Sequence, residues 1–330
     1  MPSCPQATVV ERILGQGERV HVPIGVVCNN NCQFCMESDR EGRAAAAAEM
    51  THARIEQVMA QHRGAQELCF TSGEPTTRPD LERLVAMARA MGFVRISLMT
   101  NARRMSYAPY AAALVRAGLN CVYVSIHGDS AALHDSLSRT AGSFAQTVQG
   151  VANVAKLKRA RVELNTSTVL TRRNVGRMAE IYTFLRGLGV DCVVFNALQM
   201  TGRAAVRFDA LVPRYSEVRA QFERVLQAPP DHGDRALLVD VPLCITEGLP
   251  DRNRGFVERH LHYEASDGLQ PVHTSQLDAA FRSFGGPCEE CRYRGACPGV
   301  YDPYVSRWGW DEFGVRPEAR APDGVSSPAR

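Results

Sequence analysis

The chain has 330 residues, of which 45% are hydrophobic and 22% are charged, a composition typical of a soluble globular protein with a substantial core. Its net charge of +3 is too small to favour nucleic acid or a membrane surface, so we expect neither partner. No apolar segment has the form of a signal sequence or the length of a membrane span, and we therefore expect a protein of the reducing cytoplasm.

Short apolar segments rich in β-branched residues alternate with amphipathic segments through the first two thirds of the chain. The predicted strands are 20–27, 68–71, 94–100, 121–126, 162–170 and 192–198. The predicted helices are 53–62, 80–91, 108–117, 144–159, 175–188 and 215–227. Thr51, Ser143 and Asn174 stand where N-terminal helix caps belong.

Six β/α units in series predict a parallel sheet with right-handed crossovers. Six units are two fewer than a closed barrel needs, so we expect an α/β fold with a partial, open (β/α)6 TIM-like barrel over 20–228, after an N-terminal extension over 1–19. Chemistry gathers at the carboxyl ends of barrel strands, and polar peptides follow five of the six strands. These peptides are CNNNC, TSGEP, MTNA, SIHG and NALQMTG.

The β/α pattern ends near residue 228, at the turn-rich peptide APPDHGD. We expect 229–315 to form a small C-terminal iron–sulfur cap that depends on bound metal, because the segment has little periodic apolar content. The last residues, 316–330, are expected to be a disordered tail.

Seven of the eleven cysteines fall into two groups. The first group is Cys28, Cys32 and Cys35, and the second is Cys244, Cys288, Cys291 and Cys297. In a reducing compartment, clustered cysteines indicate metal ligation or catalysis rather than disulfides. Cys69, Cys121 and Cys192 lie in apolar segments and are expected to be small buried core residues.

The first group supplies three thiolates, whereas a [4Fe–4S] cluster and a structural zinc ion each take four ligands. We predict a [4Fe–4S] cluster with one iron open to another ligand. A zinc ion completed by a distant residue is the alternative.

The spacing C-x3-C-x-Phe-C after the first predicted strand resembles the cysteine loop of the radical S-adenosylmethionine (radical SAM) superfamily, with Phe34 at the aromatic position. The peptide Thr71-Ser72-Gly73-Glu74-Pro75 resembles the GGE motif of that family, with Ser72 in place of the first glycine. The resemblance spans about residues 20–200. It implies that S-adenosylmethionine (SAM) chelates the open iron and is reductively cleaved to a 5′-deoxyadenosyl radical, which abstracts a hydrogen atom from a substrate.

The same resemblance implies a set of SAM ligands. Glu74 and the backbone of Ser72 and Gly73 would hold the SAM ammonium, and Ser125 at the end of the fourth strand would contact SAM. The full expected set is Phe34, Ser72, Gly73, Glu74, Thr100, Asn101, Ser125, Arg139, Asn165 and Leu198. Arg139 is assigned to the SAM carboxylate, and Leu198 to packing on adenine. The polar strand-end residues would otherwise satisfy turns, and His127 is expected either to touch substrate or to bond a loop.

The peptide CEECRYRGAC resembles part of the SPASM or shortened twitch extension that some radical SAM enzymes use to bind auxiliary clusters. The SPASM pattern continues with a cysteine where this chain has Tyr301. We therefore expect one auxiliary [4Fe–4S] cluster held by Cys244, Cys288, Cys291 and Cys297. A zinc ion on the same four residues is the alternative, and without Cys244 the cluster would have an open iron.

We accordingly expect a radical SAM oxidoreductase or epimerase whose auxiliary cluster assists electron transfer, with a donor such as flavodoxin or ferredoxin. Only 27 residues precede Cys28, which favours a sugar- or aminocyclitol-like substrate over a peptide. A peptide maturase served by a separate recognition protein is an alternative. A non-catalytic iron–sulfur or zinc-binding protein is an alternative of another class, but such a protein needs no SAM pocket.

Overall fold

The computed structural model describes residues 18–24, 27–37, 50–253, 259–263, 271–273 and 279–314. Its centre is a nine-stranded sheet in the order β7-β6-β5-β4-β3-β2-β1-β8-β9. The strands are β1 Glu18–Pro23, β2 Glu67–Thr71, β3 Arg95–Thr100, β4 Cys121–Ser125, β5 Glu163–Val169, β6 Cys192–Asn196, β7 Ala236–Val239, β8 Arg259–Tyr263 and β9 Pro271–His273. Strands β1 to β8 pair in parallel, and β9 is antiparallel to β8.

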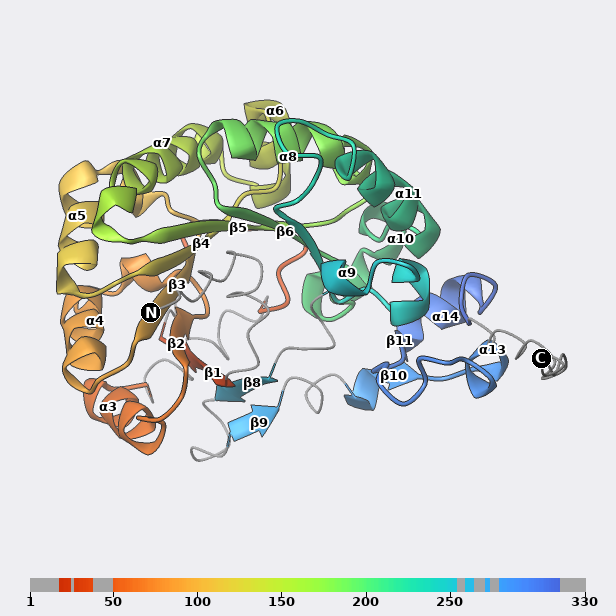
Figure 1. Ribbon diagram of the computed structural model, residues 1–330, viewed down its shortest axis with the longest axis horizontal. Coiled ribbons are helices and arrows are strands. Elements are labelled where there is room, and N and C mark those ends of the chain that lie inside the picture. The colour runs from red at the N-terminus through yellow and green to blue at the C-terminus, as the bar shows by residue number, and fades with distance from the viewer. Residues whose placement is uncertain are drawn as a thin grey trace, which may run out of the picture.

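The helices cover the convex side of this sheet, which forms an open arc (Figure 1). They are α3 His52–Gln61, α4 Leu81–Ala90, α5 Ala108–Ala117, α6 Ala131–Ser138, α7 Ser143–Lys156, α8 Met178–Gly187, α9 Gly202–Val206, α10 Phe208–Leu211 and α11 Tyr215–Val225. Short 3₁₀ helices are η1 Pro75–Thr77, η2 Arg104–Ser106, η3 Lys158–Ala160, η4 Val175–Arg177, η5 Leu243–Thr246, η6 Pro250–Arg252 and η9 Ala279–Phe281. The predicted open α/β barrel is confirmed, with each of its six predicted strands present.

The sheet extends further along the chain than predicted. Strand β7 pairs with β6, and β8 pairs with β1, although both lie in the segment that was expected to form the cap. The expected boundary after residue 228 is therefore too early. The described part of the cap proper comprises β10 Arg282–Ser283, α13 Gly286–Glu289, β11 Val300–Tyr301 and α14 Asp302–Trp308. The expected N-terminal extension and tail lie outside the described residues, apart from the first residues of β1.

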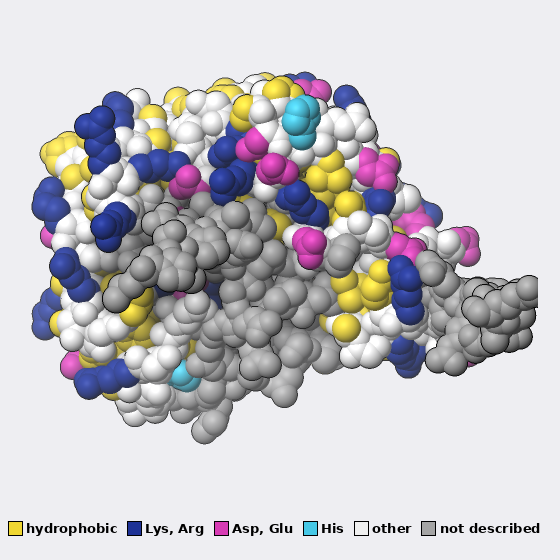
Figure 2. Space-filling view, in the orientation of Figure 1, with side chains coloured by type: hydrophobic (Ala, Val, Ile, Leu, Met, Phe, Trp, Pro, Cys, Tyr) yellow, Lys and Arg dark blue, Asp and Glu magenta, His cyan; other side chains and the backbone are white. Residues whose placement is uncertain are grey.

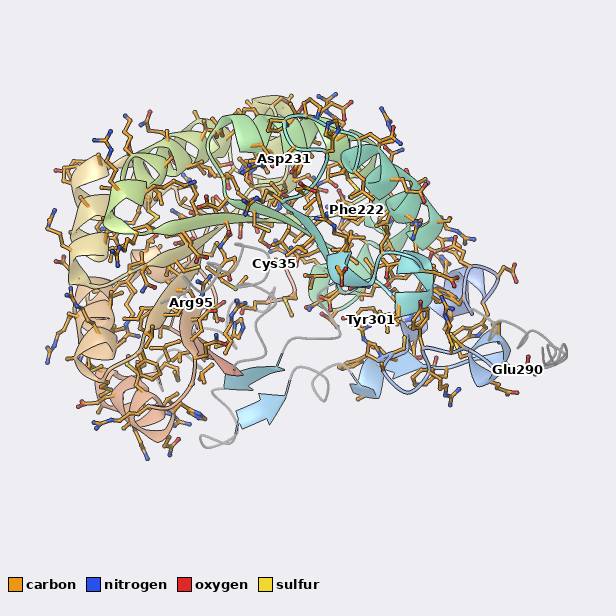
Figure 3. The ribbon with its side chains drawn as sticks, in the orientation of Figure 1. Cys35, Arg95, Phe222, Asp231, Glu290 and Tyr301 are labelled. Atoms are coloured by element: carbon orange, nitrogen blue, oxygen red, sulfur yellow. The ribbon has the colours of Figure 1, made fainter. Side chains whose placement is uncertain are left out.

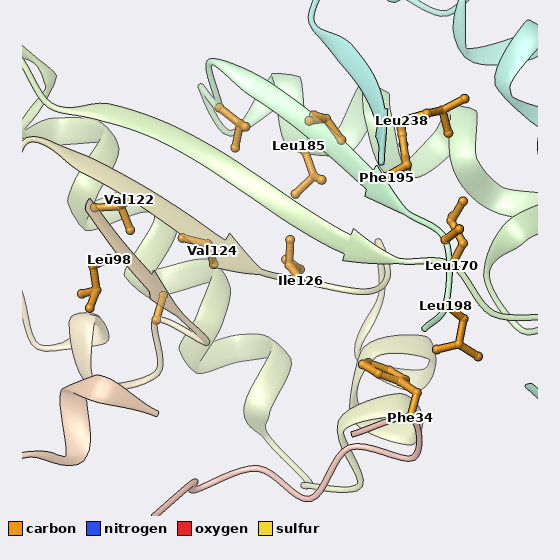
Figure 4. Packing of buried hydrophobic residues seen from close by; sticks show 14 of the residues in the cluster. Phe34, Leu98, Val122, Val124, Ile126, Leu170, Leu185, Phe195, Leu198 and Leu238 are labelled. Carbon is orange, nitrogen blue, oxygen red and sulfur yellow. The ribbon is translucent and has the colours of Figure 1, made fainter. Parts of the chain in front are cut away.

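The main hydrophobic core lies between the sheet and the helices. Leu98, Val122 and Val124 on the strands are fully buried there, as are Leu185 of α8 and Phe195 of β6 (Figure 4). The opposite, barrel-facing side of the sheet carries polar side chains at the amino ends of the strands. The two kinds of residue lie on opposite faces of the sheet, because successive side chains of a strand point to opposite faces.

The expected helix caps have mixed outcomes. Thr51 accepts a hydrogen bond from the backbone N–H of Arg54 at 3.3 Å and caps α3 as predicted. Ser143 is instead the first residue of α7. The backbone N–H of Phe144, in the first turn of that helix, donates to the carboxylate of Asp135 at 2.7 Å. Asn174 precedes η4 but makes no cap bond there, because its side chain bonds Thr171 and the backbone of His127.

The surface of the outer helices is charged. Lys and Arg side chains lie along α3, α4 and α5 in Figure 2, with Asp and Glu intermixed over the rest of that face. Among the described helices, none is long and apolar enough to cross a membrane.

Candidate functional site

Three cysteines follow β1 in an irregular loop over residues 27–37, inside the arc of the strands (Figure 3 labels Cys35). Burial raises the pKa of the Cys32 thiol to about 12, and the nearby Cys28 and Cys35 add to this rise. The three thiols are therefore neighbours. In the described part of the chain, no three His, Cys, Asp or Glu side chains are placed to hold a single metal ion. A cluster makes a different demand, because each thiolate binds its own iron.

The segment after β6 contacts this loop from one side. The Arg203 Nη1 donates to the backbone oxygens of Asn31 and Cys32, at 3.2 and 2.9 Å, and to Asn31 Oδ1 at 2.6 Å. Gly202 has a φ of 54°, and a Cβ there would lie 2.4 Å from the Met36 carbonyl oxygen. Glycine at this position therefore allows α9 to approach the cysteine loop closely.

The segment after β3 holds the same loop from the other side. Asn101 Nδ2 donates to Asn29 Oδ1 at 2.6 Å, and Arg103 Nη1 donates to Asn30 Oδ1 at 3.0 Å and to the Asn29 carbonyl. The loop that carries the thiols is thus held in place by side chains from two strand ends. The Asn101 side chain, expected to reach SAM, is engaged in holding this loop.

Glu74, in the predicted motif, is buried and bonded within the protein. Its side chain is 1% exposed, and it accepts bonds from the N–H and hydroxyl of Thr76, at 3.0 and 2.5 Å, from the Thr100 hydroxyl at 2.6 Å and from the Asn101 N–H at 2.6 Å. Burial raises the pKa of this carboxyl despite these donors. The Glu74 carboxylate and the Thr100 hydroxyl thus tie the end of β2 to the end of β3, and their expected contact with SAM stays a prediction.

A different carboxylate occupies the motif's open side. Glu37, two residues after Cys35, accepts a bond from the Gly73 N–H at 2.8 Å and one from the Ser72 hydroxyl. Ser72 has a φ of 72°, in the left-handed region that favours glycine. Glu37 was missed from the sequence. Its signal was an acidic residue close behind the third cysteine, but nothing in that spacing indicated which turn it would meet.

Serines line the carboxyl ends of β4 and β5. Ser125 pairs in register with Ser167, and the Asn196 side chain of β6 donates to the Ser167 hydroxyl at 2.9 Å. All three side chains are partly exposed. Ser125 therefore lies at the carboxyl edge of the sheet, as expected, and Ser167 and Asn196, which were not predicted, lie beside it. Asn165 does not. Its side chain donates to Cys121 Sγ at 3.6 Å, at the amino end of β4, and its expected contact with SAM stays a prediction.

The amino end of the barrel interior is a charged cluster around Asn165. Arg95 Nε lies 3.0 Å from Glu67 Oε2, and Arg95 Nη2 lies 2.8 Å from Glu163 Oε2. Arg19 Nη2 donates to the Tyr123 hydroxyl at 2.7 Å. Cys69, Cys121 and Cys192 are fully buried, as predicted, and the first two border this cluster.

His127 is held by the backbone rather than turned toward a reacting group. Its Nδ1 accepts from the Val169 N–H at 3.3 Å, and its own N–H donates to Nδ1 of His134, whose ring stacks on it at 5.7 Å. Burial holds the pKa of His127 well below its usual range. The Phe34 ring meets His127 edge-on at 4.8 Å, so the aromatic position of the cysteine loop packs against the end of β4.

The last two expected cofactor residues lie beside the cysteine loop or the β6 end. Arg139 is exposed at the C-terminal end of α6, directly after Ser138, whose carbonyl accepts from the Asn31 N–H at 2.9 Å. Leu198 is buried after β6.

The second group of cysteines also comes together. Burial raises the pKa of the Cys244 thiol to about 11, with smaller contributions from the neighbouring Cys297, Cys291 and Cys288. The backbone N–H of Gly314 bonds the Cys244 sulfur, and those of Gly299 and Leu243 bond the Cys297 sulfur. Cys244, from η5, is thus adjacent to three cysteines more than forty residues further along the chain.

An aromatic cluster joins this cap to the barrel. The Tyr304 ring lies 4.6 Å from the rings of Tyr215 and Trp308, and the Trp308 ring lies 4.8 Å from that of Phe208. Tyr301 and Tyr304 are fully buried. The aromatic residues after the last cysteine therefore pack the cap against α10 and α11.

Most of the barrel matches a known protein family. Residues 22–185 match the Radical SAM superfamily. An AdoMet-dependent heme synthase from Oleidesulfovibrio alaskensis is 33% identical over 138 residues, which are 42% of this chain and 34% of that protein. The match thus covers about a third of that relative. The PqqA peptide cyclase of Gluconobacter oxydans is 26% identical over 262 residues, which are 77% of this chain and 70% of the cyclase.

Solved structures share the fold over most of the chain. SuiB of Streptococcus suis bound to S-adenosylmethionine superposes with a TM-score of 0.59 at 13% identity, over 91% of this chain and 76% of SuiB. SuiB bound to its precursor peptide SuiA gives a TM-score of 0.58 at 13% identity, over 90% of this chain and 74% of SuiB.

Proposed function

We propose that this chain, whose residues 22–185 match the Radical SAM superfamily, uses SAM and two [4Fe–4S] clusters to oxidise or epimerise a peptide substrate. The observation that carries the proposal is the presence of two separate cysteine groups, one of three thiols and one of four. Three thiols leave an iron open for SAM, and four close a cluster that handles electrons.

The first group fits the cluster that the family implies. Cys28, Cys32 and Cys35 would ligate three of its irons and leave the fourth to the amine and carboxylate of SAM. When bound, the reduced cluster supplies the electron that cleaves SAM to the 5′-deoxyadenosyl radical, which abstracts a hydrogen atom from substrate. The protein's own part is to hold the loop, which Arg203 and Arg103 do from two sides.

Residues around the loop have the chemistry to bind SAM. The Glu37 carboxylate, together with the backbone of Ser72 and Gly73, suits the SAM ammonium, because an ammonium needs acceptors of this kind. Arg139 suits the SAM carboxylate, since it is exposed beside the cysteine loop. Ser125 suits a ribose hydroxyl, and Leu198 offers an apolar surface for adenine.

The second group favours a closed auxiliary cluster. Its four thiols include Cys244, so no iron is left open, and such a cluster suits electron transfer rather than substrate binding. Backbone N–H groups reach the sulfurs of Cys244 and Cys297, and hydrogen bonds to ligand sulfurs are among the factors that set a cluster's reduction potential. A single zinc ion is less favoured, because the described side chains are not placed around one metal ion.

The comparisons favour a peptide over the sugar-like substrate expected from the sequence. The PqqA peptide cyclase resembles the chain over 77% of its length, a span that includes residues beyond the barrel. SuiB, solved with a precursor peptide, has the same fold over 90% of the chain. The alternative of a sugar- or aminocyclitol-like substrate rested on the length of chain before Cys28, and no feature of the described site favours it.

Anaerobic reconstitution tests the proposal. With dithionite and SAM, the wild-type protein should release 5′-deoxyadenosine, and it should bind about eight irons per chain. Replacing Cys28, Cys32 and Cys35 together by Ala should lower the iron content to about four and abolish 5′-deoxyadenosine. Absence of 5′-deoxyadenosine from wild-type protein with several reductants would contradict the enzyme reading. An iron content of about four in the wild type would contradict the auxiliary cluster.

A further inference from the structure

The outer side of the cysteine loop contacts the C-terminal end of α6. The backbone N–H groups of Asn31 and Gln33 donate to the carbonyls of Ser138 and Leu137, both at 2.9 Å, and Gln33 Nε2 donates to the Ser136 carbonyl at 2.6 Å. Cys32 lies between the two residues that make these bonds. A protein that docks over this contact would therefore stand directly outside one of the three thiols.

Exposed arginines surround that contact. Arg207 Nη1 donates to Gln33 Oε1 at 2.8 Å, Arg173 Nη1 donates to the Ser136 hydroxyl at 3.3 Å, and Arg172 Nη1 donates to the Asp209 carbonyl at 3.2 Å. Val206, on α9, is 87% exposed. The basic patch is defined as Arg172, Arg173, Arg207 and Val206, all of which are exposed.

The patch has a surplus of positive charge, because the carboxylates around it are engaged elsewhere. Asp209 pairs with Arg307, although Arg172 also lies near enough to help lower its pKa, and Asp129 pairs with Arg177. Asp135 accepts from the backbone N–H groups of Gly142 and Phe144, at 2.8 and 2.7 Å. Within the described part of the chain, none of the three guanidinium groups in the patch lies within ion-pair distance of a carboxylate.

We propose that the basic patch is the docking surface for an acidic one-electron carrier protein that reduces the site at Cys28, Cys32 and Cys35. The carrier loses one electron and the [4Fe–4S] site gains it, with no bond made or broken. Uncompensated arginines steer an acidic partner and fix its orientation, and the exposed Val206 gives the interface an apolar centre. This inference rests on the proposed function.

Charge reversal within the patch tests the inference. In the Arg172→Glu/Arg173→Glu variant, the Kd for an acidic flavodoxin, measured by calorimetry at low salt, should rise about tenfold or more. The rate of 5′-deoxyadenosine release driven by flavodoxin hydroquinone should fall correspondingly at subsaturating flavodoxin. The dithionite-driven rate should stay at the wild-type level, because neither residue touches the proposed SAM site. Val206→Asp should weaken flavodoxin binding in the same way.

The matched control reverses two exposed arginines on the outer helices, Arg83→Glu on α4 and Arg116→Glu on α5. It changes the net charge by the same amount and should leave flavodoxin binding near wild type. An equal loss of binding in this control would overturn the inference, since net charge alone would then explain the effect. Unchanged binding in the patch variant would overturn it as well. A wild-type protein inactive with dithionite would instead contradict the proposed function, because flavodoxin plays no part in that assay.

Discussion

The Glu74 carboxylate joins the end of β2 to the end of β3 through four hydrogen bonds, from Thr76, Thr100 and Asn101. In Glu74→Gln the amide NH2 would meet N–H donors that now point at a carboxylate oxygen. We expect this variant to lose about 1–3 kcal/mol of unfolding free energy, because buried donors lose their acceptor. Urea denaturation of the metal-free protein measures this loss without any contribution from SAM.

Glu56→Gln, on the exposed side of α3, is the control for this measurement and should leave the unfolding free energy within about 0.5 kcal/mol of wild type. The opposite pattern, an apoprotein of unchanged stability that binds SAM much more weakly, would show instead that Glu74 is mainly a SAM ligand.

At single residues, the sequence predicted which peptides form the site better than it predicted where each side chain points. The TSGEP peptide was recognised, yet its carboxylate turns inward, and Glu37 from another loop takes the open side. Asn165 lies in a correctly predicted strand, but near its amino end, beside Cys121. These differences depend on long-range pairing between strands, and no local pattern encodes that pairing.

Helix α9 is the element that the sequence gave no means of finding, because five residues are too few to show a helical period. It nonetheless presses on the cysteine loop at Gly202, whose φ is 54°. In Gly202→Ala the added Cβ would meet the Met36 carbonyl at 2.4 Å and the Cys35 carbonyl at 2.9 Å. We expect the loop to shift and the first cysteine group to lose iron, so that the iron count per chain falls from about eight toward about four.

Gly187→Ala, at the end of α8, provides the control for that variant, since nothing lies within 4 Å of a Cβ there. Its iron content should match the wild type. If Gly202→Ala also keeps its full iron content and its SAM-dependent signal in electron paramagnetic resonance, then α9 does not position the loop.

For the whole molecule, the sequence predicted the open barrel because each β/α unit repeats the same local signals of apolar strand, amphipathic helix and turn. The end of the barrel was misplaced because the described residues between β7 and β8 form the short 3₁₀ helices η5 and η6 rather than an α-helix like those of the earlier units. Strand β8 reaches β1 from more than two hundred residues away in the chain, and such pairing leaves no trace in short-range periodicity. The cap was recognisable only by its cysteines, whose spacing favours metal ligation over packing as its explanation.

Replacing the second cysteine group separates the tasks of the two halves of the molecule. With Cys288, Cys291 and Cys297 changed to Ala, we expect about four irons per chain to remain and dithionite-driven release of 5′-deoxyadenosine to continue, because the first group and its clamps lie in the barrel. Hydrogen exchange should become faster in α13, which carries Cys288, because the proposed metal ligation would hold that segment in place. Exchange in β2 to β6 should stay at the wild-type rate.

Cys69→Ser, a buried thiol outside both groups, controls for the loss of sulfur and should retain about eight irons. Complete loss of iron in the triple variant would show instead that the two cysteine groups assemble only together.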